Sequence, residues 1–305
     1  VVRIEKGEYH FYAGHAAKMT LSPSNNTRGE KQVLFPIVGR KDLTIDGGGS
    51  TFILHGDVFP FAVTNCCGIT LRNFTMKTSV PPVAEFAALA KTDEGALIEF
   101  AADAPRFELD RILSLHSLQR LMIRYLVPGA SAEPVANLPA AFIRADLEPR
   151  EGRMALLRYS AAEPRGIDYP FDVGERVVVN LAANRERLSF FFQDCSDVKI
   201  EDVRLPRGAG MGVVAQRCRN VTLRNFDVEP ENGEGVSLTA DIVQLINCCG
   251  SVLIEDCEMS GSLDDAINIR GNYLALESVA GDKVALRTKH AQHAGFFPYR
   301  VGDEI

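Results

Sequence analysis

Apolar and polar residues alternate in several short stretches of the chain, and four of these stretches align without gaps through their centres. Each contains apolar residues with a period of two, which is the period of a β-strand with one buried face. An Asn or Asp column follows, and these side chains favour turns because they hydrogen-bond nearby backbone and tolerate positive φ. The pattern therefore predicts a repeated strand and turn, in residues 65–76, 193–205, 216–228 and 248–259.

Repeats of this size cannot bury their apolar face alone, so they must stack on copies of themselves. A fifth, less regular copy spans residues 41–53, with Leu43 and Ile45 in the apolar columns. We therefore predict an all-β fold, a right-handed parallel β-helix with turns about 4.8 Å apart. A β-sandwich with chance similarity is the alternative, which the shared register disfavours. The predicted columns are Cys66, Cys195, Cys218 and Cys249; Ile69, Val198, Val221 and Val252; Leu71, Ile200, Leu223 and Ile254; Asn73, Asp202, Asn225 and Asp256; and Phe74, Val203, Phe226 and Cys257.

The repeat is interrupted over residues 79–188, where short apolar stretches follow a different spacing between Gly, Pro and charged residues. We predict an inserted small β-barrel-like module there, with the β-helix formed by residues 1–78 and 189–272. Residues 273–305 contain two alternating stretches around a Gly-Asp pair, which is typical of a hairpin. They are expected to begin a further β module that is truncated at the end of this sequence.

Composition narrows the classes of partner and cofactor. The net charge of −7 argues against a nucleic-acid backbone, which requires a basic surface. No apolar run is long enough for a membrane-spanning helix. The seven cysteines match no zinc pattern, because Cys66-Cys67 and Cys248-Cys249 are adjacent pairs. We expect buried free thiols, and we predict neither a metal nor a cofactor.

Three aspartates are the strongest candidates for chemistry. Asp264 and Asp265 are adjacent, and Asp241 falls on the same edge of the neighbouring turn when the following strands are aligned. Three carboxylates within roughly 5–10 Å cannot all ionise cheaply, so at least one pKa should rise. One protonated and one ionised carboxyl group is what glycoside hydrolysis requires, at about 6.5–9.5 Å for inversion or about 5 Å for retention.

Other interpretations of this stretch remain open. Neighbouring residues of a regular strand point to opposite faces, so one shared site requires a bend, which Gly261 and Ser262 favour. Adjacent aspartates are otherwise common as solvated turn residues. Three carboxylates also suit calcium, although the alternating ligands and the glycine of calcium loops are absent. The glycine run after Asp46 lacks the Lys-Ser/Thr of a phosphate-binding loop and is predicted to form a tight turn.

Four segments together resemble glycoside hydrolase family 110, the α-1,3-galactosidases: KDLTIDGGGSTFILHGDVFPF, GAGMGVVAQRCRNVTLRNFDVEP, LTADIVQLINCCGSVLIEDCEMSGSLDDAINIRGNY and KHAQHAGFFPYRVGDEI. The most specific parts are T-A-D at 239–241 and D-D-A-x-N at 264–268. The resemblance implies an exo-acting, inverting α-1,3-galactosidase without metal. By motif, Asp264 resembles the general acid, and Asp241 and Asp265 resemble the pair that positions and activates water.

The resemblance also suggests the substrate and the setting. Arg270 departs from the family pattern, which has a histidine there, and a cation at this edge favours a charged or sulfated glycan. The expected partner is a glycan with terminal α-1,3-galactose, in a secreted, periplasmic or cell-surface bacterial protein that could form a dimer. The alternatives are a non-catalytic glycan-binding β-helix, an enzyme of the same fold acting on sulfated galactans, and a calcium-dependent polysaccharide lyase. The predicted substrate-binding residues are Arg270, Asn268, Gln216 and His55.

Overall fold

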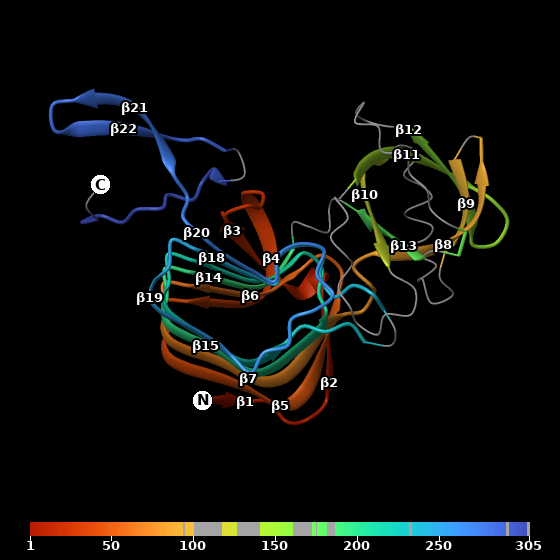
Figure 1. The fold of residues 1–305 in the computed structure, drawn as a ribbon. Coiled ribbons are helices and arrows are strands. Elements are labelled where there is room, and N and C mark those ends of the chain that lie inside the picture. The colour runs from red at the N-terminus through yellow and green to blue at the C-terminus, as the bar shows by residue number, and fades with distance from the viewer. Residues whose placement is uncertain are drawn as a thin grey trace.

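The computed structural model describes residues 1–93, 95–100, 118–126, 141–160, 173–174, 176–181, 187–231, 234–290 and 293–303. Within these ranges the chain is almost entirely β, with one short 3-10 turn, η1, at Ala13–His15. Two facing sheets, a barrel and a hairpin are visible in Figure 1. Among the described residues, no helix is long and apolar enough to cross a membrane.

Each of the two facing sheets contains strands from successive turns of the chain, hydrogen-bonded to one another in parallel. The first sheet has the order β1 (Val2–Arg3), β5 (Lys41–His55), β7 (Cys67–Thr78), β15 (Ser196–Arg207), β17 (Arg219–Asp227), β19 (Cys249–Glu255), with β2 (Glu8–Tyr12) also pairing with β5. The second sheet has the order β20 (Ile267–Arg270), β18 (Val243–Ile246), β16 (Met211–Gln216), β14 (Leu188–Gln193), β6 (Phe59–Thr64), β4 (Gly29–Val38), β3 (Ala17–Leu21). Only β3 and β4 pair antiparallel among these described strands. From β4 to β20 the chain alternates between the sheets, apart from the barrel.

The predicted columns are largely confirmed by the register of the first sheet. Val198 pairs with both Ile69 and Val221, and Val221 pairs with Val252. The next apolar column and the less regular fifth copy follow the same register. The Asn/Asp column turns the chain at positive φ, at 61° in Asn73, for example. The glycine run after Asp46 was predicted as a tight turn, but it lies within β5 as a bulge, where Gly48 and Gly49 have positive φ and the register between β5 and β7 shifts.

The cysteine column was predicted wrongly at its last member. Cys249 pairs with Arg219, so Cys248 is the residue that continues the row of thiols. The register shifts by one residue between Arg219 and Val221, and Gly250 lies at this bulge with φ of 75°. The thiol row consists of Cys66, Cys195, Cys218 and Cys248, and the Cys218 thiol donates to the Gln216 carbonyl at 3.5 Å. All seven cysteines are free, but Cys249 is exposed, contrary to the expected burial.

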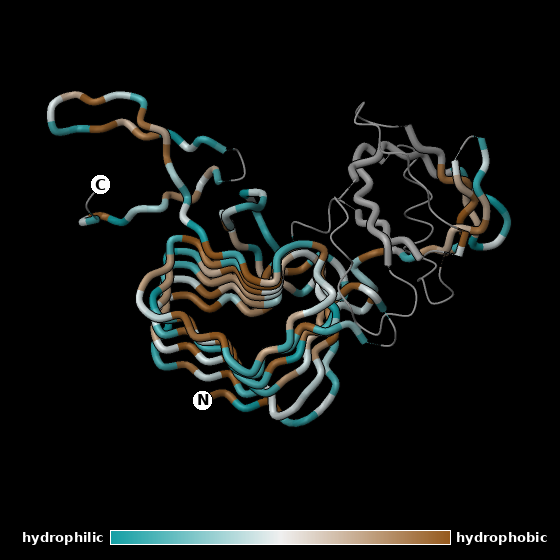
Figure 2. The backbone as a smooth tube through the Cα atoms, in the orientation of Figure 1, coloured by the Kyte–Doolittle hydropathy of each residue, from teal (hydrophilic) through white to brown (hydrophobic). Residues whose placement is uncertain are grey.

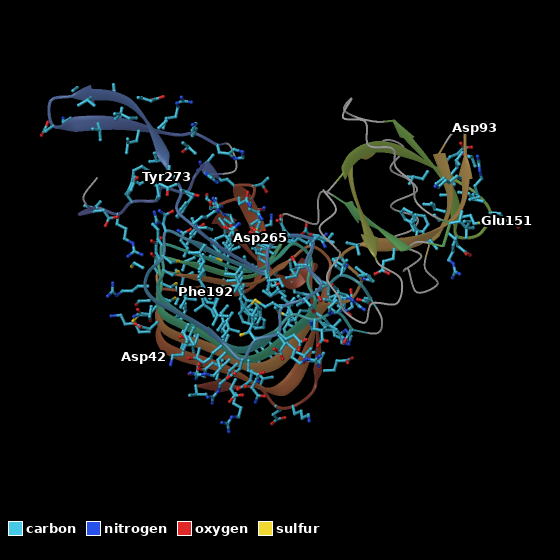
Figure 3. All side chains as sticks on the ribbon, in the orientation of Figure 1. Asp42, Asp93, Glu151, Phe192, Asp265 and Tyr273 are labelled. Atoms are coloured by element: carbon cyan, nitrogen blue, oxygen red, sulfur yellow. The ribbon has the colours of Figure 1, made fainter. Side chains whose placement is uncertain are left out.

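Apolar side chains fill the space between the sheets, and a second cluster covers the outer face of the second sheet. In β18, Val243 and Leu245 belong to the inner cluster, whereas Ile246 belongs to the outer one with Phe296. Figure 2 shows apolar residues along the strands of both sheets, and Figure 3 places Phe192 between them. Because side chains alternate, Gln244 lies on the outer face with Ile246.

The insertion forms a closed barrel, with neighbouring strands antiparallel. Its described strands are β8 (Ala84–Thr92), β9 (Gly95–Phe100), β10 (Leu118–Leu126), β11 (Ala141–Pro149), β12 (Met154–Ser160) and β13 (Arg176–Leu181). Near the end of the chain, β21 (Leu274–Ala280) and β22 (Lys283–Thr288) form the expected antiparallel hairpin. The division into domains at the predicted boundaries stays a prediction.

Candidate active site

The three aspartates converge at the start of the last two strands of the second sheet. Val243 of β18 pairs with Ile267 of β20, so Asp241 and Asp265, each two residues earlier, hold equivalent positions on adjacent turns. The Ile242 N–H donates to the Asp265 carbonyl at 2.9 Å and keeps the two turns in step. One carboxylate oxygen from each of Asp241, Asp264 and Asp265 lies within 4.8 Å of the others. Figure 3 labels Asp265 at this sheet.

Burial separates the three carboxyl groups. Asp241 is only 2% exposed, whereas Asp264 and Asp265 are open to solvent. The spacing of the nearest oxygens is shorter than the about 6.5–9.5 Å between carboxyl groups that we expected for inversion. The three carboxylates nevertheless lie close together, as the alignment of the turns predicted.

A bend before β20 allows neighbouring aspartates to face one site. Residues 263, 264 and 266 are bends, and regular strand geometry begins only at Ile267. The Ser262 hydroxyl accepts the Asp264 N–H at 3.1 Å and donates to the Ala240 carbonyl on the preceding turn at 2.8 Å. An Asp264 carboxylate oxygen accepts the Asp265 N–H at 3.2 Å. The predicted bend is therefore present, and hydrogen bonds hold it.

Replacing Gly261 with Ala is expected to destabilise this bend. Gly261 has φ of 66°, and an added Cβ would lie 2.3 Å from Pro230 Cγ. We expect the free energy of unfolding to fall by about 1–3 kcal/mol in urea titrations, from backbone strain together with the clash. Gly281→Ala is the matched control, since its φ is 64° but no atom lies within 4 Å of the added Cβ. Equal losses in both variants would contradict a packing requirement at Gly261.

Two of the carboxylates each accept a hydrogen bond from an amide side chain three residues later in the chain. Gln244 Nε2 donates to Asp241 Oδ2 at 2.6 Å, and Asn268 Nδ2 donates to Asp265 Oδ2 at 3.1 Å. Gln244 and Asn268 pair with each other across β18 and β20. Asn268 was predicted as a substrate-binding residue, and it lies beside the carboxylates. Gln244 was missed, although the spacing D-x-x-Q followed by D-x-x-N was a usable signal.

Arg270 is half-buried, and its four terminal N–H groups have partners within the chain. One terminal nitrogen donates to Asn272 Oδ1 at 2.7 Å and to His293 Nε2 at 3.1 Å. The other donates to Ser24 Oγ at 3.2 Å and to Gln244 Oε1 at 3.4 Å. These contacts disfavour the predicted interaction of Arg270 with a sulfated glycan, because its terminal N–H groups already have partners.

The electrostatics around Arg270 follow from its burial. Burial lowers the pKa of the Arg270 guanidinium, and the negative charge of Asp241 acts in the opposite direction. Burial and the adjacent Arg270 charge lower the pKa of His293. A neutral imidazole can accept the Arg270 N–H through Nε2, which is the role the contact requires.

The structure does not bring the other two predicted substrate-binding residues into contact with the aspartates. Gln216 is fully buried, where its amide accepts the Ser24 N–H at 2.9 Å and donates to Gln193 Oε1 at 2.7 Å. It therefore holds the segment around Ser24 and presents no open group to a glycan. His55 lies on β5 in the first sheet and stacks on Tyr12, with ring centroids 4.4 Å apart.

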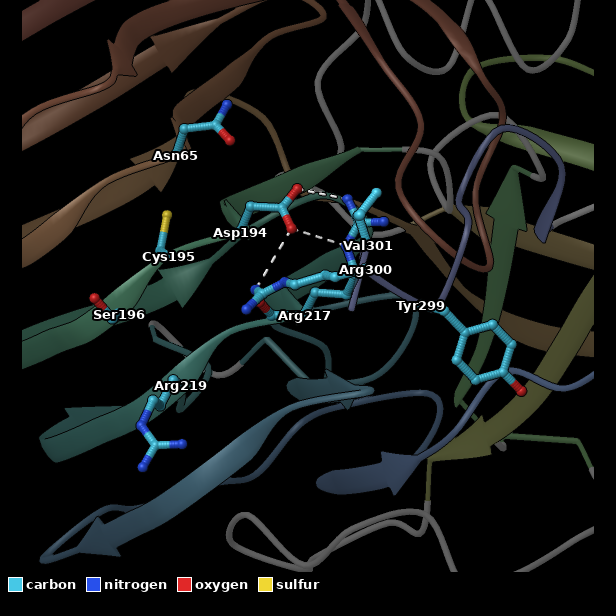
Figure 4. Close-up of a pocket in the computed structure, with 9 residues that line it drawn as sticks. All are labelled: Asn65, Asp194, Cys195, Ser196, Arg217, Arg219, Tyr299, Arg300 and Val301. Atoms are coloured by element: carbon cyan, nitrogen blue, oxygen red, sulfur yellow. Dashed lines mark hydrogen bonds and ion pairs between the residues drawn. The ribbon is translucent and has the colours of Figure 1, made fainter. Parts of the chain in front are cut away.

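A separate cavity of about 490 Å³ lies beyond the opposite ends of the second-sheet strands. Arg217 forms an ion pair with Asp194 at 2.5 Å, and Arg300 lies 3.5 Å from the same carboxylate (Figure 4). These contacts attach the segment around Arg300 to the turns that follow β14 and β16. The lining residues are Asn65, Asp194, Cys195, Ser196, Arg217, Arg219, Tyr299, Arg300 and Val301.

Comparisons with known proteins identify similar chains. The sequence is 27% identical over 309 residues to α-1,3-galactosidase A of Shewanella woodyi, covering 98% of this chain and 50% of the relative. It is 27% identical to α-1,3-galactosidase B of Phocaeicola vulgatus, covering 99% of this chain and 50% of the relative. For α-1,3-galactosidase B of Bacteroides thetaiotaomicron, identity is 26%, covering 87% of this chain and 44% of the relative.

The chain is thus similar, over nearly its whole length, to curated α-1,3-galactosidases, which confirms the resemblance to glycoside hydrolase family 110. It spans about half the length of these relatives. No family model matches the chain. A solved structure of a candidate glycosyl hydrolase from Parabacteroides merdae is 11% identical and covers 86% of this chain and 93% of the other, with a TM-score of 0.19.

Proposed function

We propose that the protein to which this chain belongs is a glycoside hydrolase that removes terminal α-1,3-linked galactose from glycans, acting from the chain end. The convergence of Asp241, Asp264 and Asp265 within 4.8 Å is the observation that carries the proposal. The similarity to α-1,3-galactosidases supports the choice of sugar and linkage. The same proposal includes the right-handed parallel β-helix as the scaffold, supported by the alternation of the chain between two parallel sheets.

The three carboxyl groups have different roles in this proposal. Asp264 is exposed at the bend before β20, and it acts as the acid that protonates the leaving oxygen. Asp241 and Asp265 occupy equivalent positions on adjacent turns, each held by an amide. Their oxygens are proposed to bind one water between them and to activate it for attack on the anomeric carbon.

Release of galactose from an α-1,3-galactosyl disaccharide tests this function directly. Inversion predicts that proton NMR detects β-galactose first, whereas retention predicts the α anomer first. The 4.8 Å limit applies to one oxygen from each carboxyl group, and it does not give the separation of the whole groups. The first-formed anomer therefore distinguishes inversion from retention. Binding of the disaccharide without any cleavage would instead support a non-catalytic glycan-binding protein.

Metal removal is expected to leave the proposed activity unchanged. The three oxygens are close enough to hold an ion, but general acid–base catalysis by carboxyl groups requires none. We expect galactose release after exhaustive EDTA dialysis to stay within about twofold of the untreated rate, well below the 10²–10⁴-fold of general acid–base catalysis. Loss of activity that added Ca²⁺ restores, at an unchanged melting temperature, would overturn the metal-independent mechanism.

The setting follows from the same proposal. The proposed substrate is a glycan, and the relatives named above come from bacteria. We therefore propose a secreted, periplasmic or cell-surface location. Fractionation of the native host, with antibody detection, would test this placement.

A further inference from the structure

The buried carboxylate of Asp241 is connected to a cation through one intervening side chain. Gln244 donates from Nε2 to Asp241 Oδ2 at 2.6 Å and accepts at Oε1 from Arg270 at 3.4 Å. The amide therefore has its donor turned toward the carboxylate and its acceptor turned toward the guanidinium. Reversing the amide would place its oxygen against the carboxylate and its N–H groups against the cation, so the two neighbours select one orientation.

Burial makes this orientation consequential. Gln244 is fully buried and Asp241 is 2% exposed, so water cannot easily replace a lost partner. A buried carboxylate without its hydrogen bonds is costly, and a protein relieves the cost by protonating or moving it. The donor from Gln244 favours the ionised form of Asp241, which is the form that a base requires.

Arg270 is itself fixed by segments distant in the sequence. Its guanidinium group reaches Ser24, which is 246 residues earlier, and His293, which is 23 residues later. Ser24 also accepts from the buried Asn272 amide at 2.7 Å. These contacts restrict the rotamers of Arg270 and keep one of its terminal N–H groups directed at Gln244.

We propose that Gln244 and Arg270 are positioning residues, which hold the Asp241 carboxylate ionised and turned toward Asp264 and Asp265. This rests on the proposed function, in which Asp241 helps to activate water. The role differs from the glycan contact expected for Arg270, because its terminal N–H groups are directed into the chain. Gln244 acts through Asp241, and Arg270 acts through Gln244.

The charged groups around Asp241 determine how the proposal is tested by pH. Asp264 and Asp265 approach from the bend before β20, and Arg270 approaches from β20 itself. On the other side, among the described residues, β16 contributes the Gly212 N–H, which donates to the Asp241 carbonyl at 3.1 Å and carries no charge. Removing the Gln244 donor raises the pKa of Asp241, so the acid limb of kcat/KM should move to higher pH.

The test compares wild type with Gln244→Leu, Arg270→Met and Arg270→Lys. For Gln244→Leu we expect kcat to fall by roughly 10–100-fold with little change in KM, as for groups that orient a reacting residue. The acid limb should rise by about one pH unit. Arg270→Met should move the limb in the same direction. Arg270→Lys keeps the positive charge but loses the planar set of guanidinium donors, so it should move the acid limb less.

A carbon NMR titration of Asp241 supplies a readout that does not depend on activity. The carboxyl signal is assigned by its loss in Asp241→Asn, and its midpoint should rise in Gln244→Leu. Ser50→Ala is the control for loss of a buried polar side chain, because Ser50 lies on β5 of the first sheet, where its hydroxyl accepts the Gly7 N–H at 3.2 Å and donates to the Glu5 carbonyl at 2.9 Å. It should lower stability without moving the Asp241 midpoint.

An unchanged midpoint in both Gln244→Leu and Arg270→Met would overturn the positioning role, as would equal shifts in Gln244→Leu and Ser50→Ala. If Gln244→Leu does not fold, Arg270→Lys still tests the same connection. Absence of galactose release by the wild-type protein would overturn the proposed function instead. In that case the carboxyl titration still decides whether Gln244 and Arg270 control Asp241.

Discussion

Asp264→Asn is expected to lower kcat on an α-1,3-galactosyl disaccharide by 10²–10⁴-fold, because the asparagine amide cannot protonate the leaving oxygen. The side chain is exposed, so we expect the melting temperature to change little. A 4-nitrophenyl α-galactoside, whose leaving group needs little protonation, should lose much less rate. The comparison of the two substrates therefore separates the role of an acid from a general disturbance of the site.

Asp282→Asn is the control for loss of one exposed carboxylate, since Asp282 lies in the turn between β21 and β22. It should retain full activity on both substrates. A loss of less than about tenfold in Asp264→Asn, below the usual range for general acid catalysis, would contradict the assignment. Equal losses on the two substrates would point to a different role for this carboxyl group.

Phe190→Ala is expected to cost about 3–5 kcal/mol of folding free energy, the usual range for removing a buried aromatic ring. Phe190 is fully buried, with its ring centroid 5.4 Å from that of Phe61 and 6.0 Å from that of Phe226. These rings come from β6, β14 and β17, so the substitution removes contacts between turns and between sheets. Far-UV circular dichroism in guanidinium chloride measures the loss.

Tyr273→Ala serves as the control for this substitution, since Tyr273 is 81% exposed. Its effect should stay within about 0.5 kcal/mol, as for most surface positions. A loss at Phe190 no larger than that at Tyr273 would show that the aromatic contacts between turns contribute little to stability.

Much of the strand register could be predicted because the same physical requirement recurs in every turn. Val198 and Val221 must face the same interior, and Asp202 and Asn225 must both turn the chain at positive φ. Asn225 Nδ2 also donates to Asp202 Oδ1 at 2.7 Å, so the turn column stabilises itself. A periodic requirement of this kind leaves a periodic sequence.

The misplaced cysteine shows where this reasoning fails. An alignment without gaps puts Cys249 beside Cys218, but β19 has one extra residue between Cys249 and Val252, opposite Arg219 to Val221. Gly250 is the residue that permits it, with positive φ, and an added Cβ would lie 2.3 Å from Asn220 Oδ1. A glycine inside an otherwise regular strand pattern was the available signal of a bulge.

The candidate site was predictable only in part, for a different reason. Asp241 and Asp265 lie within the repeat, so aligning the turns brings them together. Ser24 and His293 lie outside it, and they reach Arg270 through packing between distant segments. No local pattern encodes such contacts, since they depend on how the ends of the chain fold back over the outer face of the second sheet.

The bulge at Gly250 bears on how such a chain tolerates insertions and deletions. The extra residue is taken up within β19, and β18 and β20 still pair in step from Val243 and Ile267 onward. The segments that link the two sheets, which form the corners of each turn, can therefore gain or lose residues while the aspartates keep their spacing. One residue added between Asp265 and Ile267 would instead rotate the carboxylate out of line with Asp241. Lineages of this protein should accordingly vary in length at the corners and stay constant over the two residues that follow each aspartate.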